Sequence, residues 1–413
     1  MSPGGRPLAR GVLRRLLPCL GALAGLAASA CSEEGSLPVG GGGGGPEEPV
    51  AEWALVAAGD GFSCGLADDG RAFCWGTRRG GALGDGETEG ESAVPVRVEP
   101  DLRSDLRLDT LVAGRGHACG LTRRGTAWCW GDSRAGQVGA ATPERCRDGD
   151  GRFVCSSRPR VAAGSLAFAS ISAGGEHTCG VTGEGLVACW GSNEAGQLGQ
   201  GRLGGGGREP RAVRGFVFRT VAAGGGHTCG ITGGRDVLCW GANGFGQLGD
   251  RTRLISTFPS TVTIRGADAL VAGADHTCVL APAHCWGRGD AGRLGDGSVL
   301  DAPFPVRVQG EHAFRQLEPG EAHTCGIAGD GAALCWGRGD RGALGTGSLP
   351  GARTVPVPVE GDRAWRDLGA GAGHACGVTA EGRLLCWGTN AAGQLGDGTF
   401  ERRPAPVAVA SPG

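Results

Sequence analysis

One stretch recurs seven times along the chain, most clearly at residues 221–250, VAAGGGHTCGITGGRDVLCWGANGFGQLGD. The residues at the histidine position of the seven copies are Phe62, His117, His177, His227, His276, His323 and His374, so successive copies lie 47 to 60 residues apart. Repeats of this length form propeller blades or helical pairs. Glycine and proline interrupt every copy, and a helix interior tolerates neither. The repeat therefore predicts an all-β, seven-bladed β-propeller over residues 52–413.

The pattern within one copy predicts four strands. Apolar runs separated by glycine turns place strands at 218–223, 228–232 and 236–241. A Pro-x-x-Val segment after the loop, such as 95–98 or 305–308, supplies a fourth strand, since proline is tolerated at an edge. We therefore expect four-stranded blades.

The N-terminus reads as an export signal over residues 1–30, with four arginines, an apolar core at 16–26 and the small residues Ala28, Ser29 and Ala30. The next residue, Cys31, resembles the lipidated cysteine of bacterial lipoproteins. The glycine-rich, acidic segment that follows, to residue 51, has the composition of a flexible tether. We expect an outer-membrane or surface lipoprotein of a bacterial cell envelope; the alternative is cleavage without lipidation and secretion.

Sixteen of the 18 cysteines form pairs with regular spacing, and the other two are Cys19 and Cys31. In the third copy, a turn at 183–185 sets Cys179 opposite Cys189, where Cβ atoms lie about 4.5 to 5.5 Å apart and suit a disulfide. An export signal favours disulfides, and the spacing does not match the close cysteine pairs of zinc sites. The predicted disulfides join Cys64 to Cys74, Cys119 to Cys129, Cys146 to Cys155, Cys179 to Cys189, Cys229 to Cys239, Cys278 to Cys285, Cys325 to Cys335 and Cys376 to Cys386.

The tryptophans and histidines of the repeat have predicted structural roles. Each tryptophan follows a cysteine and points to the other face of its strand, so we expect it to pack between blades. Six histidines at one repeat position indicate a structural slot, because an active site would break the symmetry. We expect no catalytic residue, no metal site and no cofactor.

These copies resemble the regulator-of-chromosome-condensation repeat. Residues 221–228, VAAGGGHT, and 240–249, WGANGFGQLG, match both halves of its motif. The resemblance implies a seven-bladed β-propeller. The chain is identified as an exported, disulfide-rich member, because its cysteines stand where the family usually has apolar residues. Phe62 replaces one histidine, and Gly289 and Gly339 replace the loop asparagine.

The longest interruption of the repeat, at 140–164, is the candidate binding loop. A disulfide would stiffen it in advance, which lowers the ordering cost of binding. Its candidate binding residues are Arg145, Arg147, Asp148, Asp150, Arg152 and Phe153.

The sequence favours a monomeric scaffold, held on the membrane through its lipid alone, that binds a protein or glycan partner. With 40 basic and 42 acidic residues the chain lacks the charge of a nucleic-acid binder. Two alternatives stay open. The first is a secreted enzyme inhibitor, as one bacterial propeller of this type is. The second is a lyase or hydrolase acting at the channel mouth, which would need asymmetric acid and base residues there.

Overall fold

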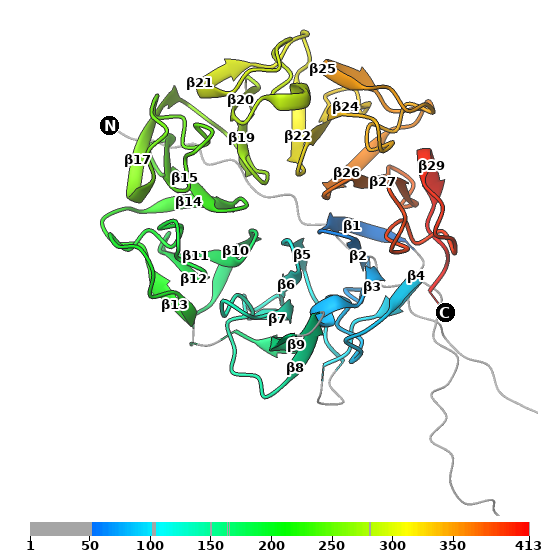
Figure 1. The fold of residues 1–413 in the computed structure, drawn as a ribbon, viewed down its shortest axis with the longest axis horizontal. Coiled ribbons are helices and arrows are strands. Elements are labelled where there is room, and N and C mark those ends of the chain that lie inside the picture. Colours follow the sequence, from blue (N-terminus) through cyan, green and yellow to red (C-terminus); the bar gives the residue numbers. More distant parts are fainter. Residues whose placement is uncertain are drawn as a thin grey trace, which may run out of the picture. The chain divides into compact units, whose positions relative to one another are not determined.

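The computed structural model describes residues 52–100, 105–148, 151–162, 164, 166–280 and 282–412. The predicted signal peptide (1–30), Cys31 and the tether (31–51) lie outside the described residues. Seven antiparallel sheets surround a central channel, as Figure 1 shows. This arrangement confirms the predicted seven-bladed propeller.

The first three blades follow one another from the N-terminal side. Blade 1 consists of β1 (Trp53–Ala58), β2 (Phe62–Ala67), β3 (Ala72–Thr77) and β4 (Glu91–Arg97). Blade 2 consists of β5 (Thr110–Ala113), β6 (His117–Leu121), β7 (Ala127–Asp132), β8 (Arg145–Asp148) and β9 (Gly151–Val161). Blade 3 consists of β10 (Phe168–Ala173), β11 (His177–Thr182), β12 (Val187–Gly191) and β13 (Gly207–Ala212).

The remaining blades have four strands each. Blade 4 is β14 (Phe218–Ala223), β15 (His227–Thr232), β16 (Asp236–Gly241) and β17 (Ser256–Arg265). Blade 5 is β18 (Leu270–Ala272), β19 (His276–Val279), β20 (His284–Gly287) and β21 (Ala302–Arg307). Blade 6 is β22 (Phe314–Pro319), β23 (His323–Ala328), β24 (Ala333–Arg338) and β25 (Ala352–Pro358). Blade 7 is β26 (Trp365–Ala370), β27 (His374–Thr379), β28 (Leu384–Gly388) and β29 (Arg403–Ala408). Two short 3-10 helices, η1 (Arg79–Gly81) and η2 (Asp290–Gly292), lie in loops.

Strand boundaries within the repeat agree with the expected ones to within one residue in blade 4. The register also agrees, because Cys179 lies opposite Cys189 and Cys278 opposite Cys285. The difference lies in blade 2, whose strand order is β5-β6-β7-β9-β8. Only part of 140–164 is therefore an insertion, since residues 155–161 of β9 pair with β7 as the fourth strand of the blade.

The two faces of the disc carry different connections. On one face, which we call the mouth-side face, the first and third strands of each blade end and the long loop after the third strand begins. We call the turn-side face the one that carries the tight turns between second and third strands. The first described strand starts on the turn-side face, because Trp53 donates its backbone N–H to the carbonyl of Gly382, 3.0 Å away in such a turn. The last strand, β29, runs toward the same face, from Arg403 opposite Gly388 to Ala408 opposite Leu385.

The ring closes between blades 7 and 1 through side contacts, because each blade is one continuous segment of chain. Trp53, Phe73 and Trp75 of blade 1 pack in one core cluster with Val378, Leu384 and Leu395 of blade 7. The other clusters also bridge neighbouring blades. The core of the protein is thus divided among seven seams.

Candidate binding face

The cysteines of the repeat join the second and third strands of every blade. Their S–S distances are 2.07 to 2.11 Å and their Cα atoms are 4.0 or 4.1 Å apart. All seven bridges are fully buried, so they stabilise the hairpins and are inaccessible to a partner. They join Cys64 to Cys74, Cys119 to Cys129, Cys179 to Cys189, Cys229 to Cys239, Cys278 to Cys285, Cys325 to Cys335 and Cys376 to Cys386.

An eighth bridge lies outside the repeat. Cys146 of β8 and Cys155 of β9 are joined with their Cα atoms 5.8 Å apart. The eight bridges of the structure are the pairs expected from the spacing. Cys31 and Cys19 lie outside the described residues.

Each repeat tryptophan is fully buried and bonds to the preceding blade. Its indole N–H donates to a backbone carbonyl in the Gly-Gln-Leu-Gly-like loop of that blade, at 2.9 or 3.0 Å. The pairs are Trp75 and Gln394, Trp130 and Ala82, Trp190 and Gln137, Trp240 and Gln197, Trp286 and Gln247, Trp336 and Arg293, and Trp387 and Ala343. The interblade role expected from the sequence is therefore present in all seven seams.

The histidines lie in the same seams. The Nε2 atoms of five contact a hydroxyl of the next blade at 2.8 or 2.9 Å. For example, Thr228 donates to the carbonyl of Gln197, so its oxygen accepts from the Nε2–H of His177. Burial lowers the pKa of His177 and His374 to about 4 and that of His117, His227 and His323 to about 3. These rings are therefore neutral, and the five with a hydroxyl partner bond across a seam, which fits a structural role.

Two seams depart from this pattern. Phe62 of blade 1 faces a seam in which blade 2 offers Ala118 where other blades have a hydroxyl, so an apolar pair replaces a polar one. In blade 6, His323 keeps its ring, but blade 7 has Ala375 at the hydroxyl position, and the buried Nε2 atom has no partner among the described residues. The exchange at Phe62, visible in the sequence, thus has its explanation in the neighbouring blade.

A ring of seven glycines forms the inner edge of the mouth-side face. A Cβ atom on Gly114 would lie 2.3 Å from the carbonyl oxygen of Gly174, and one on Gly224 would lie 2.6 Å from that of Gly273. Only glycine permits this approach. The cavity inside the ring has a volume of about 530 Å³, and the charged residues at its edge are Asp60, Arg115, Glu176, Asp275 and Glu321. The mouth is therefore net acidic.

Two further carboxylates lie deeper in the channel, at the side formed by blades 6 and 7. The amide of Gln316 donates to Glu318 (3.1 Å) and to Asp367 (2.9 Å), and Asp367 also accepts the backbone N–H of Val56 (2.8 Å). Burial and the nearby Asp367 raise the pKa of Glu318 to about 8, and burial raises the pKa of Asp367. These bonds link blades 6, 7 and 1, so the acidic side chains serve ring closure.

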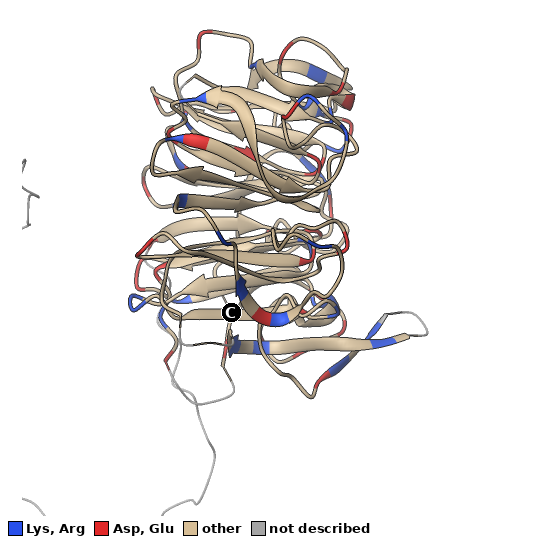
Figure 2. Cartoon of the chain, turned by 90° about the vertical axis from the view of Figure 1, so that its left-hand side faces the viewer, with Lys and Arg blue, Asp and Glu red and all other residues tan. Residues whose placement is uncertain are grey.

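The candidate binding loop forms a hairpin of β8 with the first half of β9. Because β9 continues past the end of β7, the hairpin extends beyond the disc on the mouth-side face, as Figure 2 shows. Arg145, Arg147 and Arg152 are exposed. Phe153 is half-buried, with the Arg134 guanidinium 3.9 Å from its ring centre. Asp150 lies outside the described residues, and Asp148 is placed in β8 by its backbone only.

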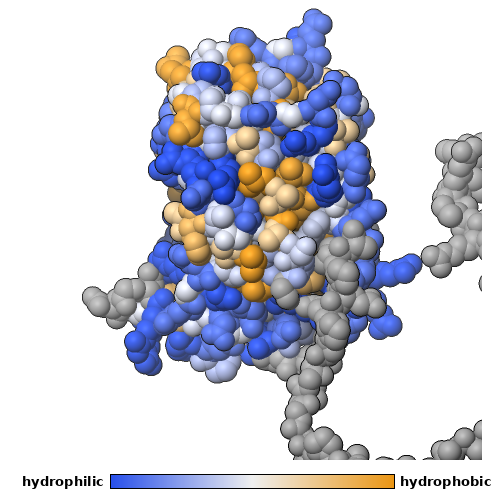
Figure 3. All heavy atoms as spheres, turned by 90° about the vertical axis from the view of Figure 1, so that its right-hand side faces the viewer, coloured by the Kyte–Doolittle hydropathy of each residue, from blue (hydrophilic) through white to orange (hydrophobic). Residues whose placement is uncertain are grey.

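The mouth-side loops of blades 3 to 7 carry exposed apolar side chains that the sequence reasoning missed. They stand just before the fourth strand of each blade and are 51 to 75% exposed: Leu203, Leu254, Leu300, Leu349 and Phe400. The signal was present, because each follows the last glycine of the Gly-Gln-Leu-Gly-like loop by four or five residues. On the side drawn in Figure 3, apolar side chains form small patches within a largely hydrophilic surface.

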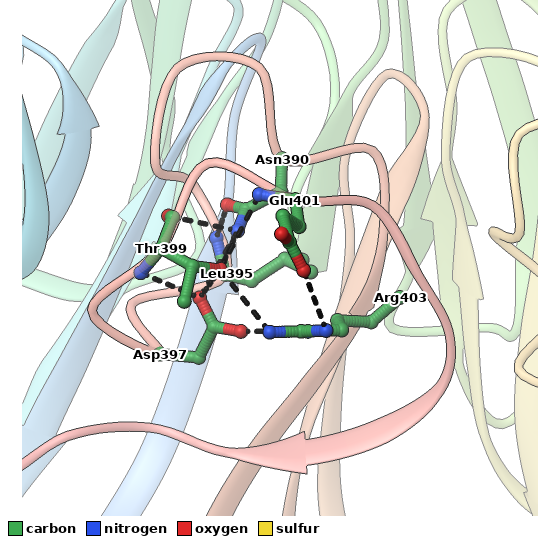
Figure 4. A network of polar contacts seen from close by, with 6 residues as sticks. All are labelled: Asn390, Leu395, Asp397, Thr399, Glu401 and Arg403. Atoms are coloured by element: carbon green, nitrogen blue, oxygen red, sulfur yellow. Dashed lines mark hydrogen bonds and ion pairs between the residues drawn. The ribbon is translucent and has the colours of Figure 1, made fainter.

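Side-chain bonds hold these loops in place. Figure 4 shows Asn390, whose amide donates to Asp397 (3.0 Å) and to the carbonyl of Thr399 (2.9 Å), while its oxygen accepts the N–H of Leu395 (2.9 Å). Arg403 donates to Asp397 at 2.9 Å. In blade 4, Asn243 donates to the carbonyl of Leu254 at 3.0 Å. The loops are therefore ordered before any partner binds, which reduces the cost of binding.

The described residues contain no helix long and apolar enough to cross a membrane. Over the same residues, no group of three or more histidine, cysteine or acidic side chains is placed to hold a metal ion. The histidines and cysteines of the repeat thus stand apart, in seams and hairpins.

These features define a disulfide-linked, seven-bladed propeller of the regulator of chromosome condensation type. Models of the regulator of chromosome condensation (RCC1) repeat match residues 53–77, 109–137, 168–197, 218–247 and 365–394, and residues 184–231, 330–378 and 381–413. The chain belongs to the RCC1 repeat family, as its resemblance predicted.

Similar proteins share the repeat over part of their length. The human probable E3 ubiquitin-protein ligase HERC6 is 29% identical over 151 residues, which are 35% of this chain and 13% of that protein. The mitochondrial RCC1 domain-containing protein RUG3 of Arabidopsis thaliana is 32% identical over 152 residues, 36% of this chain and 33% of that protein. The chain thus spans a third or less of these relatives. The structure of Prp20p from Saccharomyces cerevisiae has a TM-score of 0.72 at 22% identity, over 84% of this chain and 87% of that one.

Proposed function

We propose that the protein is an exported, lipid-anchored scaffold of the bacterial cell envelope that binds a protein partner through its mouth-side face. One observation carries the proposal: three features suited to binding occur together on that face. It bears the hairpin of blade 2, the net acidic channel mouth and the five exposed apolar side chains. Exposed apolar side chains among charged neighbours are typical of protein interfaces.

The position of β1 supports the anchoring part of the proposal. The propeller begins at residue 52 on the turn-side face, opposite the hairpin. A tether from a lipidated Cys31 would join the disc at that face, which does not carry the proposed binding features.

Similar structures support binding of proteins. Yeast RCC1 (Prp20) has been solved bound to Kap60, and Prp20p from Saccharomyces cerevisiae has binding properties to Gsp1p and histones. Those partners belong to those proteins. For this chain the proposal takes over only the coarser property, binding of a protein by the propeller.

Photo-crosslinking in intact cells tests the binding face. A photoreactive amino acid is placed at Leu254 or Leu300, which are 75% and 73% exposed, and at Val217 as the control, which is 59% exposed and precedes β14 on the turn-side face. We expect a discrete adduct with one protein from positions 254 and 300 and none from 217. Adducts from position 217 alone, or from no position, would refute the proposed face.

Mass spectrometry of the mature N-terminus tests the anchor. We expect a chain that begins at Cys31 and carries fatty acyl groups, recovered in the membrane fraction. An unmodified N-terminus would refute anchoring and favour the secreted alternative, in which a soluble form inhibits an enzyme.

A further inference from the structure

We propose that a groove between the hairpin and blade 3 binds an extended acidic segment of the partner protein. This inference rests on the proposed function and adds the chemistry of the partner. The groove has a volume of about 650 Å³ and lies on the mouth-side face. Its walls are residues 133–136 and 140–143, Arg145 and Val154 of the hairpin, and residues 206–208 at the start of β13.

The hairpin has two chemically different faces. Alternation along its strands places Cys146, Phe153 and Cys155 on one face, and this face is the more buried one. The other face carries three exposed arginines and half-buried Val154: Arg145, opposite Val154, and Arg147, directly opposite Arg152. Like charges directly opposite on neighbouring strands destabilise a hairpin. A bound anion would relieve that repulsion.

The wall of the groove is cationic. Arg134, Arg145 and Arg208 line it, and no carboxylate is among its described lining residues. Arg134 is paired with Asp132 at 2.9 Å, so the charge open to a ligand comes from Arg145 and Arg208. Arg208 is exposed, and Arg145 donates only to the carbonyls of Pro143 (3.3 Å) and Glu144 (2.9 Å) in the bonds described. Arginine binds a carboxylate through two parallel N–H groups, which makes it the favoured partner of carboxylate groups. The groove is therefore complementary to an acidic ligand.

An extended polypeptide fits this site better than other polyanions. Strand β8 is an edge of its sheet, paired on one side only, with β9. Its other side offers backbone N–H and C=O groups to an added strand, a recurrent way of binding peptides. The disulfide between Cys146 and Cys155 fixes the hairpin in advance, so binding requires little further ordering of this protein.

Edge protection is the competing explanation, since charged side chains on an edge strand also prevent aggregation. Edge protection requires only that charges stand on each edge strand. Here Arg145 and Arg208, on the edge strands β8 and β13 of two different blades, both line one groove. The peptide titration separates the two explanations.

Fluorescence anisotropy with defined peptides tests the proposal. The probes are a labelled octapeptide of alternating Glu and Val and its Gln-Val counterpart, titrated with the disulfide-intact propeller, residues 52–413. The variant R145Q/R147Q/R152Q is compared with R123Q/R124Q, which changes exposed arginines in the turn between β6 and β7 of the same blade. Both variants alter exposed side chains, and thermal unfolding checks that both remain folded.

We expect the Glu-Val peptide to bind, the Gln-Val peptide to bind at least about tenfold more weakly, and the triple variant to lose about tenfold in affinity. Binding should weaken at 0.5 M salt because exposed charge pairs are screened. Equal binding of both peptides, unchanged affinity of the triple variant, or binding of heparin without the Glu-Val peptide would overturn the proposal. If the photo-crosslinked adducts at positions 254 and 300 are still found in that case, only the proposal for the groove is refuted and the proposed scaffold function is retained. If those adducts are also absent, the proposed scaffold function is refuted as well.

Discussion

The seams between blades and the mouth-side face have opposite organisation. In the seams, the same tryptophan bond recurs seven times and all seven indoles are fully buried. On the mouth-side face, blade 2 has a hairpin, blades 3 to 7 have apolar loop residues, and the acidic groups of the mouth come from some blades only. The residues that recur in all seven blades hold the ring, and the features of the mouth-side face that differ between blades are available for binding.

The first test of this comparison acts on all seams at once, through pH. The six histidines are neutral and buried, and their pKa is lowered in the folded protein, to about 3 or 4 in five of them. The unfolded chain therefore binds more protons as pH falls below 6.5, which favours unfolding, by about 3 kcal/mol for each of those five at pH 4. Urea unfolding followed by tryptophan fluorescence at pH 7.5, 5.5 and 4 should show a steep loss of stability.

Glu318 has the opposite sign. Its raised pKa of about 8 means that ionisation of the unfolded chain favours unfolding as pH rises from 4.5 through 8. At pH 7.5 the E318Q variant should thus be more stable than the wild-type protein. At pH 4 it should lose stability as the wild-type protein does, because its histidines are unchanged.

Equal stability of the wild-type protein at pH 7.5 and 4 would contradict the assignment of neutral seam histidines.

The second test removes one seam residue and one residue of the mouth-side face. Trp240→Ala deletes a fully buried indole and its bond to Gln197, which should cost about 3 to 5 kcal/mol. Leu254→Ala truncates a side chain that is 75% exposed and should change stability by less than about 0.5 kcal/mol. Denaturant midpoints compare the two variants. A comparable loss in both would mean that the mouth-side loops belong to the core.

A third test exchanges the chemistry of two seams. Thr228→Val leaves the buried Nε2 of His177 without a partner and should cost about 1 to 3 kcal/mol. Ala375→Ser offers His323 the hydroxyl that its seam lacks and should stabilise the protein by about 0.5 to 1.5 kcal/mol. Calorimetric midpoints measure both changes. Destabilisation by Ala375→Ser would show that this seam has no room for a hydroxyl.

The sequence predicts the features that depend on short spacing. The turn at 183–185 fixes the register of Cys179 and Cys189, and strand alternation sends each tryptophan into a seam. Contacts between blades are less accessible, because the pairing of His177 with Thr228 depends on how successive blades twist. The groove joins residues 133–136, 140–143, Arg145 and Val154 of blade 2 to residues 206–208 of blade 3, and the channel carboxylates join three blades. The sequence pattern within a single blade does not reveal such contacts between blades.

The last test concerns the disulfide that lies outside the seams. C146S/C155S opens a bridge that is also buried but that ties down only β8, a strand outside the repeated four, so the thermal midpoint should change by less than about 2 °C. C229S/C239S opens the bridge between the second and third strands of a blade and should lower the midpoint by several degrees, since such a bridge is worth about 2 to 3 kcal/mol. Limited trypsin digestion should cut C146S/C155S after Arg147 or Arg152 much faster than the wild-type protein, because a freed hairpin opens locally. Equal loss of midpoint in both variants would show that the hairpin contributes to the ring and that the division between seams and mouth-side face is incomplete in blade 2.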